Sequence, residues 1–217
     1  MPNLVLNLWK KHLGHVPDEV WEHPEIKTLV LADNDLFEIP CKIGDLQHLR
    51  TLDLGHNTLT HLPEELGHLT NLRDFLYLHD NQLTSLPASL CNLTALRYLN
   101  ISENAFRELP NAICGMKSLI ELRATDNRLS SLPDCLTNLT HLRELHLRNN
   151  QFTALPESIC ALAELRQIDL RGNPLTSLPH SLADLPKLEK LDLRWNTAID
   201  LPPWIEDLES RGCAVYV

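Results

Sequence analysis

Histidine and aspartate side chains stand close together in one region of the chain, where they suggest metal chemistry. His56 and His79 are 23 residues apart, and Asp80 directly follows His79. Imidazole and carboxylate groups are ligands that Zn²⁺ accepts. The same 23-residue spacing recurs along the whole chain, however, so repetition explains it without coordination. The sequence therefore predicts a solvated surface here and no metal site.

The six cysteines are the other reactive residues. Cys91, Cys114 and Cys160 each lie four residues after a proline, in a position that elsewhere holds Gly, Thr or Ala, which indicates small buried residues. A disulfide between Cys91 and Cys114 is an open alternative. Six cysteines without a recognisable secretory leader favour free thiols and a reducing compartment.

Catalytic signatures are missing from the sequence. No GxxxxGK[ST], GxGxxG, HExxH, GxSxG or CxxC motif occurs. A hidden enzyme would have to use His56, His79 or Asp80, and no nucleophile with a base and a stabilising group accompanies them. We therefore expect a protein that is not an enzyme, with no catalytic residues and no cofactor.

Charge and hydropathy exclude further classes of function. The formal net charge of the 217 residues is -10, which argues against binding to nucleic acid or to an anionic membrane. No apolar run approaches the roughly 20 residues that span a bilayer. The N-terminal stretch lacks the pattern of a signal peptide. We expect a cytoplasmic, monomeric protein; export as an effector without a cleaved leader stays open.

An internal repeat organises almost the whole chain. Asparagine recurs at positions 34, 57, 81, 104, 127, 150, 173 and 196, and a proline follows each one after six residues. The intervals are 23 residues, except for 24 between Asn57 and Asn81. Lys11 and Pro17 continue the series upstream as a degenerate unit. Such periods are typical of solenoids, in which each unit buries its apolar side chains against its neighbours.

Each unit predicts the same local structure. In Leu49–Leu69 the alternating TLDL stretch indicates a strand with every second side chain buried. The Asn then turns the chain, and its amide is suited to bonding backbone groups that the turn leaves unpaired. The Pro ends the extended segment, and a short 3₁₀ or helical turn follows.

This pattern resembles the leucine-rich repeat family over nearly the whole chain, and with 23-residue units and the Leu-Pro turn it is similar to intracellular Ras-group-related and bacterial members. The resemblance implies an α/β fold: a right-handed curved solenoid with a parallel concave sheet and short helical or 3₁₀ turns on the convex side. We expect residues 1–24 to form an N-terminal cap with the degenerate repeat, 25–202 to form eight repeats, and 203–217 to form a C-terminal cap. The last segment should hold a turn or helix and a final strand.

The solvent-facing strand positions are the expected binding surface. Three columns lie four, two and one residues before the repeat Asn, and they contain Arg, Tyr and Trp, which are common at interface hot spots. The candidate partner-binding residues are Tyr77, His79, Asn100, Arg123, His146, Arg148, Arg171, Arg194 and Trp195. The Arg column suits an acidic protein partner. A solvated face held by cross-strand ion pairs is the alternative.

These features predict a non-catalytic protein–protein interaction module. The family resemblance implies an intracellular adaptor, a scaffold or a regulator of signalling proteins. A secreted or host-delivered bacterial recognition protein is the alternative.

The one irregular interval places an extra residue among Arg73, Asp74 and Phe75. Tolerated length variation before a strand explains it, because loops accept insertions at little cost. The alternative is a β-bulge that brings Phe75 beside Tyr77 and His79 as an aromatic contact.

Overall fold

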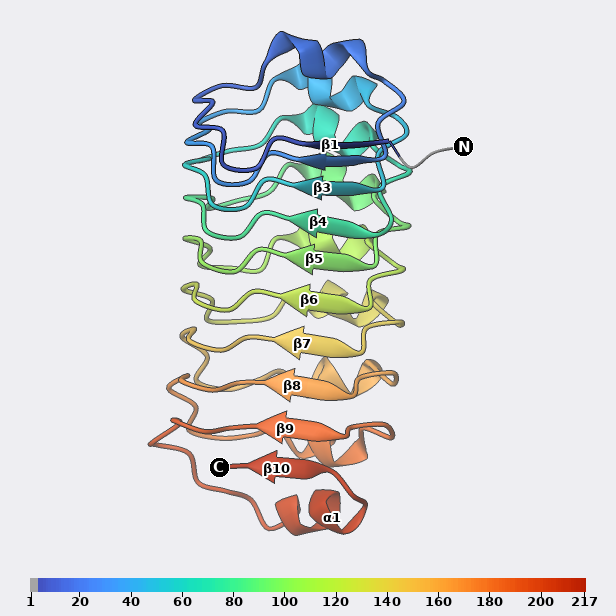
Figure 1. The fold of residues 1–217 in the computed structure, drawn as a ribbon. Coiled ribbons are helices and arrows are strands. Elements are labelled where there is room, and N and C mark those ends of the chain that lie inside the picture. Colours follow the sequence, from blue (N-terminus) through green and yellow to red (C-terminus); the bar gives the residue numbers. More distant parts are fainter. Residues whose placement is uncertain (1–3) are drawn as a thin grey trace.

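The computed structural model describes residues 4–217, so the first three residues of the predicted N-terminal cap lie outside the described residues. Ten strands form a single parallel sheet in chain order, curved and unclosed (Figure 1). The strands are Val5–Asn7 (β1), Thr28–Val30 (β2), Thr51–Asp53 (β3), Phe75–Tyr77 (β4), Tyr98–Asn100 (β5), Glu121–Arg123 (β6), Glu144–His146 (β7), Gln167–Asp169 (β8), Lys190–Asp192 (β9) and Ala214–Tyr216 (β10). The solenoid predicted from the repeats is confirmed.

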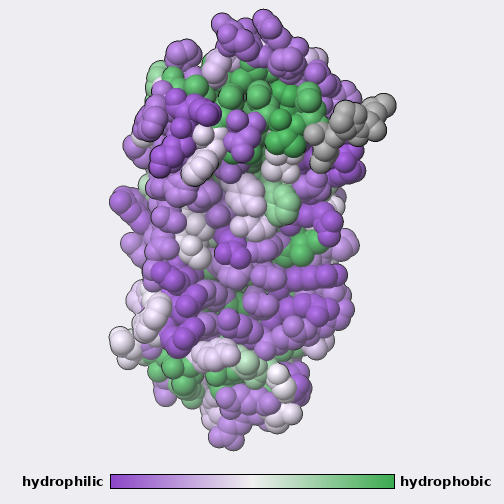
Figure 2. Space-filling model, viewed as in Figure 1, coloured by the Kyte–Doolittle hydropathy of each residue, from purple (hydrophilic) through white to green (hydrophobic). Residues whose placement is uncertain are grey.

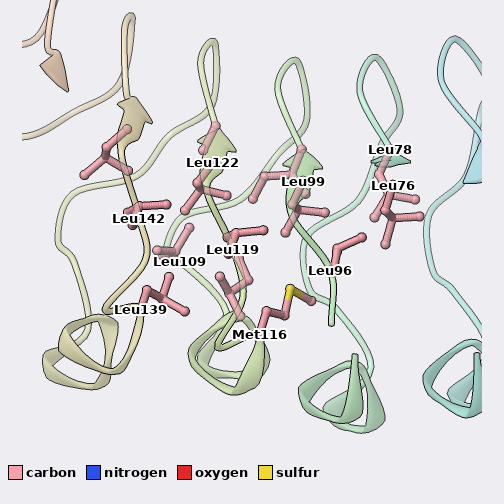
Figure 3. Packing of buried hydrophobic residues seen from close by; sticks show 14 of the residues in the cluster. Leu76, Leu78, Leu96, Leu99, Leu109, Met116, Leu119, Leu122, Leu139 and Leu142 are labelled. Carbon is pink, nitrogen blue, oxygen red and sulfur yellow. The ribbon is translucent and has the colours of Figure 1, made fainter. Parts of the chain in front are cut away.

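The core lies between the sheet and the turns behind it. The central residue of each strand from β2 to β9 is a buried Leu or Ile, and neighbouring strands align these residues, as Leu52, Leu76 and Leu99 do. Residues from the connecting segments, such as Met116 and Leu119, close this layer from the other side (Figure 3). Alternation along each strand therefore turns the flanking side chains to solvent.

Short 3₁₀ helices return the chain along the convex side, each beginning directly after a repeat proline. They are Asp18–Glu22 (η1), Cys41–Asp45 (η2), Glu64–His68 (η3), Ala88–Asn92 (η4), Asn111–Gly115 (η5), Asp134–Asn138 (η6), Glu157–Ala161 (η7) and His180–Asp184 (η8). Proline suits this place because its φ is fixed and the position needs no N–H donor. The predicted 3₁₀ turns are confirmed.

The repeat asparagines connect successive units through the backbone. The Nδ2 of Asn57 donates to the carbonyls of Leu31, Leu54 and Gly55 at 3.0–3.1 Å, and its Oδ1 accepts from the amide of Leu36 at 3.0 Å. The predicted bonding of the repeat Asn to backbone groups is confirmed, and the amide of Asn57 satisfies backbone groups of two units. The Asn side chains are thus part of the scaffold and not of the exposed face.

The C-terminal end carries the one α-helix of the described residues. Helix α1, Ile205–Ser210, buries Ile205 and Leu208, and β10 then pairs in parallel with β9. The helix and final strand expected in this segment are confirmed. Within residues 4–217, no helix has the length and apolar character needed to cross a membrane.

Two cysteines are joined, which corrects the expectation of six free thiols. A disulfide links Cys114 in η5 with Cys135 in η6, whose Cα atoms are 5.6 Å apart. The Cys91–Cys114 pair considered from the sequence does not form. The expectation of small buried residues is also wrong for Cys91 and Cys160, which are exposed. Strand periodicity could not reveal this pair, because it is made between turns on the convex side.

The extra residue leaves the strand register unchanged. Phe75 pairs with Thr51 on one side and Tyr98 on the other, and the pairing runs through Tyr77 without interruption. In the preceding unit, the amides of Arg50 and of Thr51, which begins β3, share the carbonyl of Lys27. In this unit the amides of Arg73 and Asp74 share the carbonyl of Arg50, one residue earlier relative to the strand, so the additional length is taken up directly before β4. The insertion is therefore length variation before the strand, and no bulge interrupts β4 itself. Of the aromatic contact expected of a bulge, the stacking of Phe75 on Tyr77 forms, whereas His79 lies against Tyr77.

Candidate functional site

The concave face carries all nine candidate residues identified from the sequence. Four of them are the last residues of strands β4 to β7: Tyr77, Asn100, Arg123 and His146. Four others lie two residues after the end of a strand: His79, Arg148, Arg171 and Arg194. Trp195 directly follows Arg194. Figure 2 shows that this face is hydrophilic over β5 to β9 and more apolar near β1 and β2.

A fourth exposed column was missed in the sequence. It lies six residues before the repeat Asn, at the first residue of each strand, and includes Phe75, Tyr98, Glu121 and Glu144. The sequence did contain a signal for this column. Alternate residues of a strand lie on one face, so a residue six positions before the Asn shares the face of those four and two positions before it. These side chains extend the face by one row.

The arginine–tryptophan cluster, defined as Arg148, Arg171, Arg194 and Trp195, occupies the C-terminal half of this face. The three guanidinium carbons lie 5.8, 5.5 and 6.0 Å from the centroid of the Trp195 ring. These distances are in the range of cation–π attraction. The indole itself remains 61% exposed. The cluster therefore presents a flat aromatic surface framed by cations.

Two of these arginines are neutralised by aspartates of their own strands. Arg171 makes two hydrogen bonds to Asp169, at 2.9 and 2.6 Å, and Arg194 makes two to Asp192, at 2.9 and 2.7 Å. Burial by itself raises the pKa of Asp192, but the hydrogen bonds from Arg194 and the charge of Arg171 outweigh burial and leave this pKa below its usual value. These two pairs lie along single strands; the cross-strand pairing expected as an alternative is seen between Nε of Arg171 and Oδ2 of Asp192, which are 3.6 Å apart.

Arg148 differs from the other two because no carboxylate pairs with it among residues 4–217. Its Nε is buried and has no hydrogen-bond partner in this part of the chain. A depression of about 410 Å³ beside it is lined in part by Arg123, His146 and Asp169. A buried donor without a partner is unfavourable, so an anionic or carbonyl group of a ligand would be stabilised here.

An aromatic cluster, defined as Phe75, Tyr77 and Tyr98, lies at the middle of the face. Phe75 stacks on Tyr77 with ring centroids 5.7 Å apart, and Tyr98 lies 5.4 Å from Phe75 and 5.1 Å from Tyr77. Burial raises the pKa of Tyr98 to about 12, so its hydroxyl stays protonated and can donate a hydrogen bond. Phe75 is 42% exposed, which leaves the cluster open to a partner.

The residue directly before the repeat Asn is acidic in four units, at Asp33, Asp80, Glu103 and Asp126, and the backbone explains this preference. Every non-glycine residue directly before a repeat Asn has a positive φ, between 51° and 67°. Asp, Asn and Gly tolerate this left-handed region best, so Asp33, Asp80 and Asp126 belong to the turn. Trp195 holds the same conformation at φ 67°, which is strained for a large side chain and identifies it as unusual among the repeats.

His56, His79 and Asp80 form a hydrogen-bonded chain. Nδ1 of His56 donates to Asp80 at 2.6 Å, so Nε2 of a neutral His56 ring has no proton and accepts from Nε2 of His79 at 3.3 Å. Nδ1 of His79 is then a buried acceptor without a partner. Burial, followed by the charge of His56, lowers the pKa of His79 below 6.5.

This lowered pKa predicts a pH-dependent stability. As the pH falls below about 6.5, His79 is protonated in the unfolded chain, whereas in the folded chain it is protonated only at a lower pH. The unfolded state therefore binds more protons, and the free energy of unfolding should fall as the pH falls through this window. In denaturant titrations between about pH 7 and 5, His79→Gln should show a smaller loss of stability than wild type. His68→Gln, at an exposed site, controls for the loss of one imidazole. Equal slopes for wild type and His79→Gln would contradict the prediction.

A solenoid of this kind, with an open sheet and an exposed concave face, defines a class of repeat proteins that bind through that face. A family model described as "Leucine rich repeat" matches residues 24–76. A second model, described as "Leucine-rich repeat region", matches residues 65–145 and 133–210. The chain belongs to the leucine-rich repeat family, whose fold generally mediates protein–protein interaction.

Solved structures with the same fold come from bacteria and plants. A leucine-rich repeat protein of Leptospira interrogans is 26% identical with a TM-score of 0.75; the match covers 98% of this chain and 65% of that one. The leucine-rich repeat ectodomain of the Arabidopsis thaliana membrane receptor kinase GASSHO1/SCHENGEN3, in complex with CASPARIAN STRIP INTEGRITY FACTOR 2, is 31% identical with a TM-score of 0.79, over 93% of this chain and 25% of that one. The plant peptide hormone receptor RGFR1, in complex with RGF2, is 26% identical with a TM-score of 0.71, over 99% and 39%. A comparison with curated proteins finds no match.

Proposed function

We propose that this protein is a non-catalytic adaptor, scaffold or regulator of intracellular signalling proteins, and that it binds an acidic protein partner through its concave face. The exposed Trp195, held in a strained backbone conformation among three arginines, carries the proposal. Trp and Arg are the residues that most often dominate interface energetics. A folded chain gains nothing from a strained, exposed indole unless a partner covers it.

The charge distribution supports an acidic partner despite the net charge of -10. Arg148 has no carboxylate of its own in the described chain and lies next to the depression, while Arg171 and Arg194 have well-positioned aspartates. A carboxylate of the partner would satisfy Arg148, and an apolar group would cover Trp195. The aromatic cluster, three strands towards the N-terminus from Arg148, supplies a second contact.

The structural neighbours support a partner of peptide or protein nature. The GASSHO1/SCHENGEN3 and RGFR1 structures are complexes with other polypeptides, which shows what those receptors bind. This chain spans a quarter to two thirds of the proteins it matches, so their activities as whole proteins are not carried over.

An affinity capture from lysate of the source cells, followed by a binding measurement with the captured partner, tests the proposal. The bait is wild type, beside the double variant Arg148→Glu/Trp195→Ala and a matched control, Arg107→Glu, which reverses an exposed arginine outside the cluster. Hot-spot truncations cost at least about 2 kcal/mol, so the double variant should bind roughly 30-fold or more weakly. Circular dichroism verifies that all three proteins fold.

The control variant decides between the two explanations of the cluster. Loss of binding in the double variant with retention in Arg107→Glu supports the proposed site. Equal binding by all three proteins would place the interface elsewhere and leave the cluster as a solvated surface.

An exported recognition protein is the second candidate. The Cys114–Cys135 disulfide favours it, because such bonds persist mainly in oxidising compartments. The similarity to a Leptospira protein is compatible with a bacterial source. The thiol state of the protein isolated from its own cells distinguishes this candidate from the intracellular one.

A further inference from the structure

Glu121, Glu144 and His146 bring three metal-ligating atoms together on the concave face, between the aromatic cluster and the arginine–tryptophan cluster. All three ligand atoms lie within 4.8 Å of one another. Nε2 of His146 is 3.2 Å from Oε2 of Glu144 and 3.7 Å from Oε1 of Glu121. The side chains are half-buried, with 16% of His146 and 20% of Glu121 exposed.

The strand register causes this convergence. Glu121 and Glu144 pair directly across β6 and β7, and His146 follows two residues after Glu144 on the same face. Adjacent parallel strands are about 4.8 Å apart, so the two carboxylates repel each other unless a cation lies between them. Arg123 offsets part of this repulsion through a 2.5 Å contact from its Nε to Oε1 of Glu121. One of the two carboxylates is therefore left without an arginine partner in the described part of the chain.

We propose that Glu121, Glu144 and His146 bind one divalent transition-metal ion of the Zn²⁺ class. A tetrahedral ion with bonds of about 2.0–2.1 Å separates its ligands by about 3.3 Å, which lies between the two nitrogen–oxygen distances observed here. One imidazole with two carboxylates is a ligand set that Zn²⁺, Co²⁺ and Mn²⁺ accept. Three protein ligands leave a fourth coordination position for water.

Arg123 is compatible with a bound ion. Each carboxylate oxygen has two lone pairs, so Oε1 of Glu121 can accept the Arg123 hydrogen bond and still bind the metal. Hydrogen bonds of this kind orient metal ligands in proteins. The positive charge of Arg123 weakens the site, and we therefore expect a reversible ion and not a structural one that folding requires.

The His56–His79 pair is the weaker candidate on the same face. It offers two nitrogens that face each other at 3.3 Å, and Asp80 already occupies the other nitrogen of His56. It serves as the internal control, because it tests whether exposed histidines alone account for binding.

Isothermal titration of the protein with Zn²⁺ and Mn²⁺, without an affinity tag, tests the proposal. Exposed thiols also bind Zn²⁺, so all proteins carry Cys41→Ser, Cys91→Ser and Cys160→Ser. We expect one equivalent of Zn²⁺ to bind and to raise the thermal midpoint. His146→Gln and Glu144→Gln should each weaken binding at least about tenfold. His79→Gln should bind as the parent does.

Co²⁺ provides a second readout, since its visible spectrum reports coordination by nitrogen and oxygen in the parent and its loss in His146→Gln. Absence of saturable binding at millimolar metal, or equal affinity in the parent and His146→Gln, would overturn the proposal. The result is independent of partner capture, because Arg148 and Trp195 are unchanged in every protein of the series.

Discussion

Replacing Asn127 by Ala should reduce the free energy of unfolding by about 3 kcal/mol or more. The Nδ2 of Asn127 donates to the carbonyls of Ile101 and Thr125 at 3.0 and 3.1 Å, and its Oδ1 accepts from the amide of Phe106 at 3.1 Å. The substitution removes these bonds and leaves buried backbone groups of two units unsatisfied, which costs more than the bonds contribute.

Denaturant unfolding followed by circular dichroism measures this loss. Asn138→Ala is the matched control, because it removes an asparagine from the exposed end of η6. The effect should be largest in the middle of the array, where each unit has neighbours on both sides. A loss below about 1 kcal/mol for Asn127→Ala would mean that water replaces the side chain, contrary to its burial.

Breaking the Cys114–Cys135 disulfide is expected to have an effect of similar size. The bond closes a loop with a sequence separation of 21 residues, for which the loss of unfolded-state entropy corresponds to roughly 3 kcal/mol. Cys135→Ser should therefore be less stable than wild type under non-reducing conditions and equally stable when both proteins are reduced. Denaturant titrations with and without dithiothreitol make the comparison.

Thiol labelling provides the control for this prediction. In the oxidised protein three exposed cysteines should react when folded, Cys213 should react after unfolding, and the remaining two only after reduction. Six reactive thiols in protein isolated without reductant would contradict the bond in its native compartment and favour the cytoplasm. If the stability of the wild type were the same with and without reductant, the disulfide would not contribute to the free energy of unfolding.

The repeating part of the fold was predictable because one local rule is applied many times. Alternation at Leu52, Leu76 and Leu99 indicated buried strand centres, and the Asn and Pro spacing placed each turn and each 3₁₀ helix. The alternation in one unit alone would be an ambiguous indication of a strand. Because a single unit cannot bury its leucines, however, the repeated units must stack in register. The same rule predicted three of the columns that face solvent, and the fourth, at the first residue of each strand, was missed.

The candidate site was predictable as a surface and not as a set of contacts. The positions of Arg148, Arg171 and Arg194 in one column followed from the repeat, and their likeness in sequence suggested equal roles. The structure separates them, because Asp169 and Asp192 pair with Arg171 and Arg194, whereas Arg148 is left without a carboxylate among residues 4–217. The sequence did contain a signal for this difference, since the residue two positions earlier is Asp for Arg171 and Arg194 and His for Arg148.

The sequence by itself determined the solenoid, the parallel sheet, the turn asparagines that bond the backbone, and the exposed face, since all of these repeat and depend on neighbours at fixed separation. Only the tertiary structure decided the contacts that repetition does not specify. These are the Cys114–Cys135 bond between turns, the stacking of Phe75 on Tyr77 after an insertion that leaves the register intact, and the meeting of Glu121, Glu144 and His146. Each depends on side-chain direction and curvature across strands, which the order of residues within one unit does not fix.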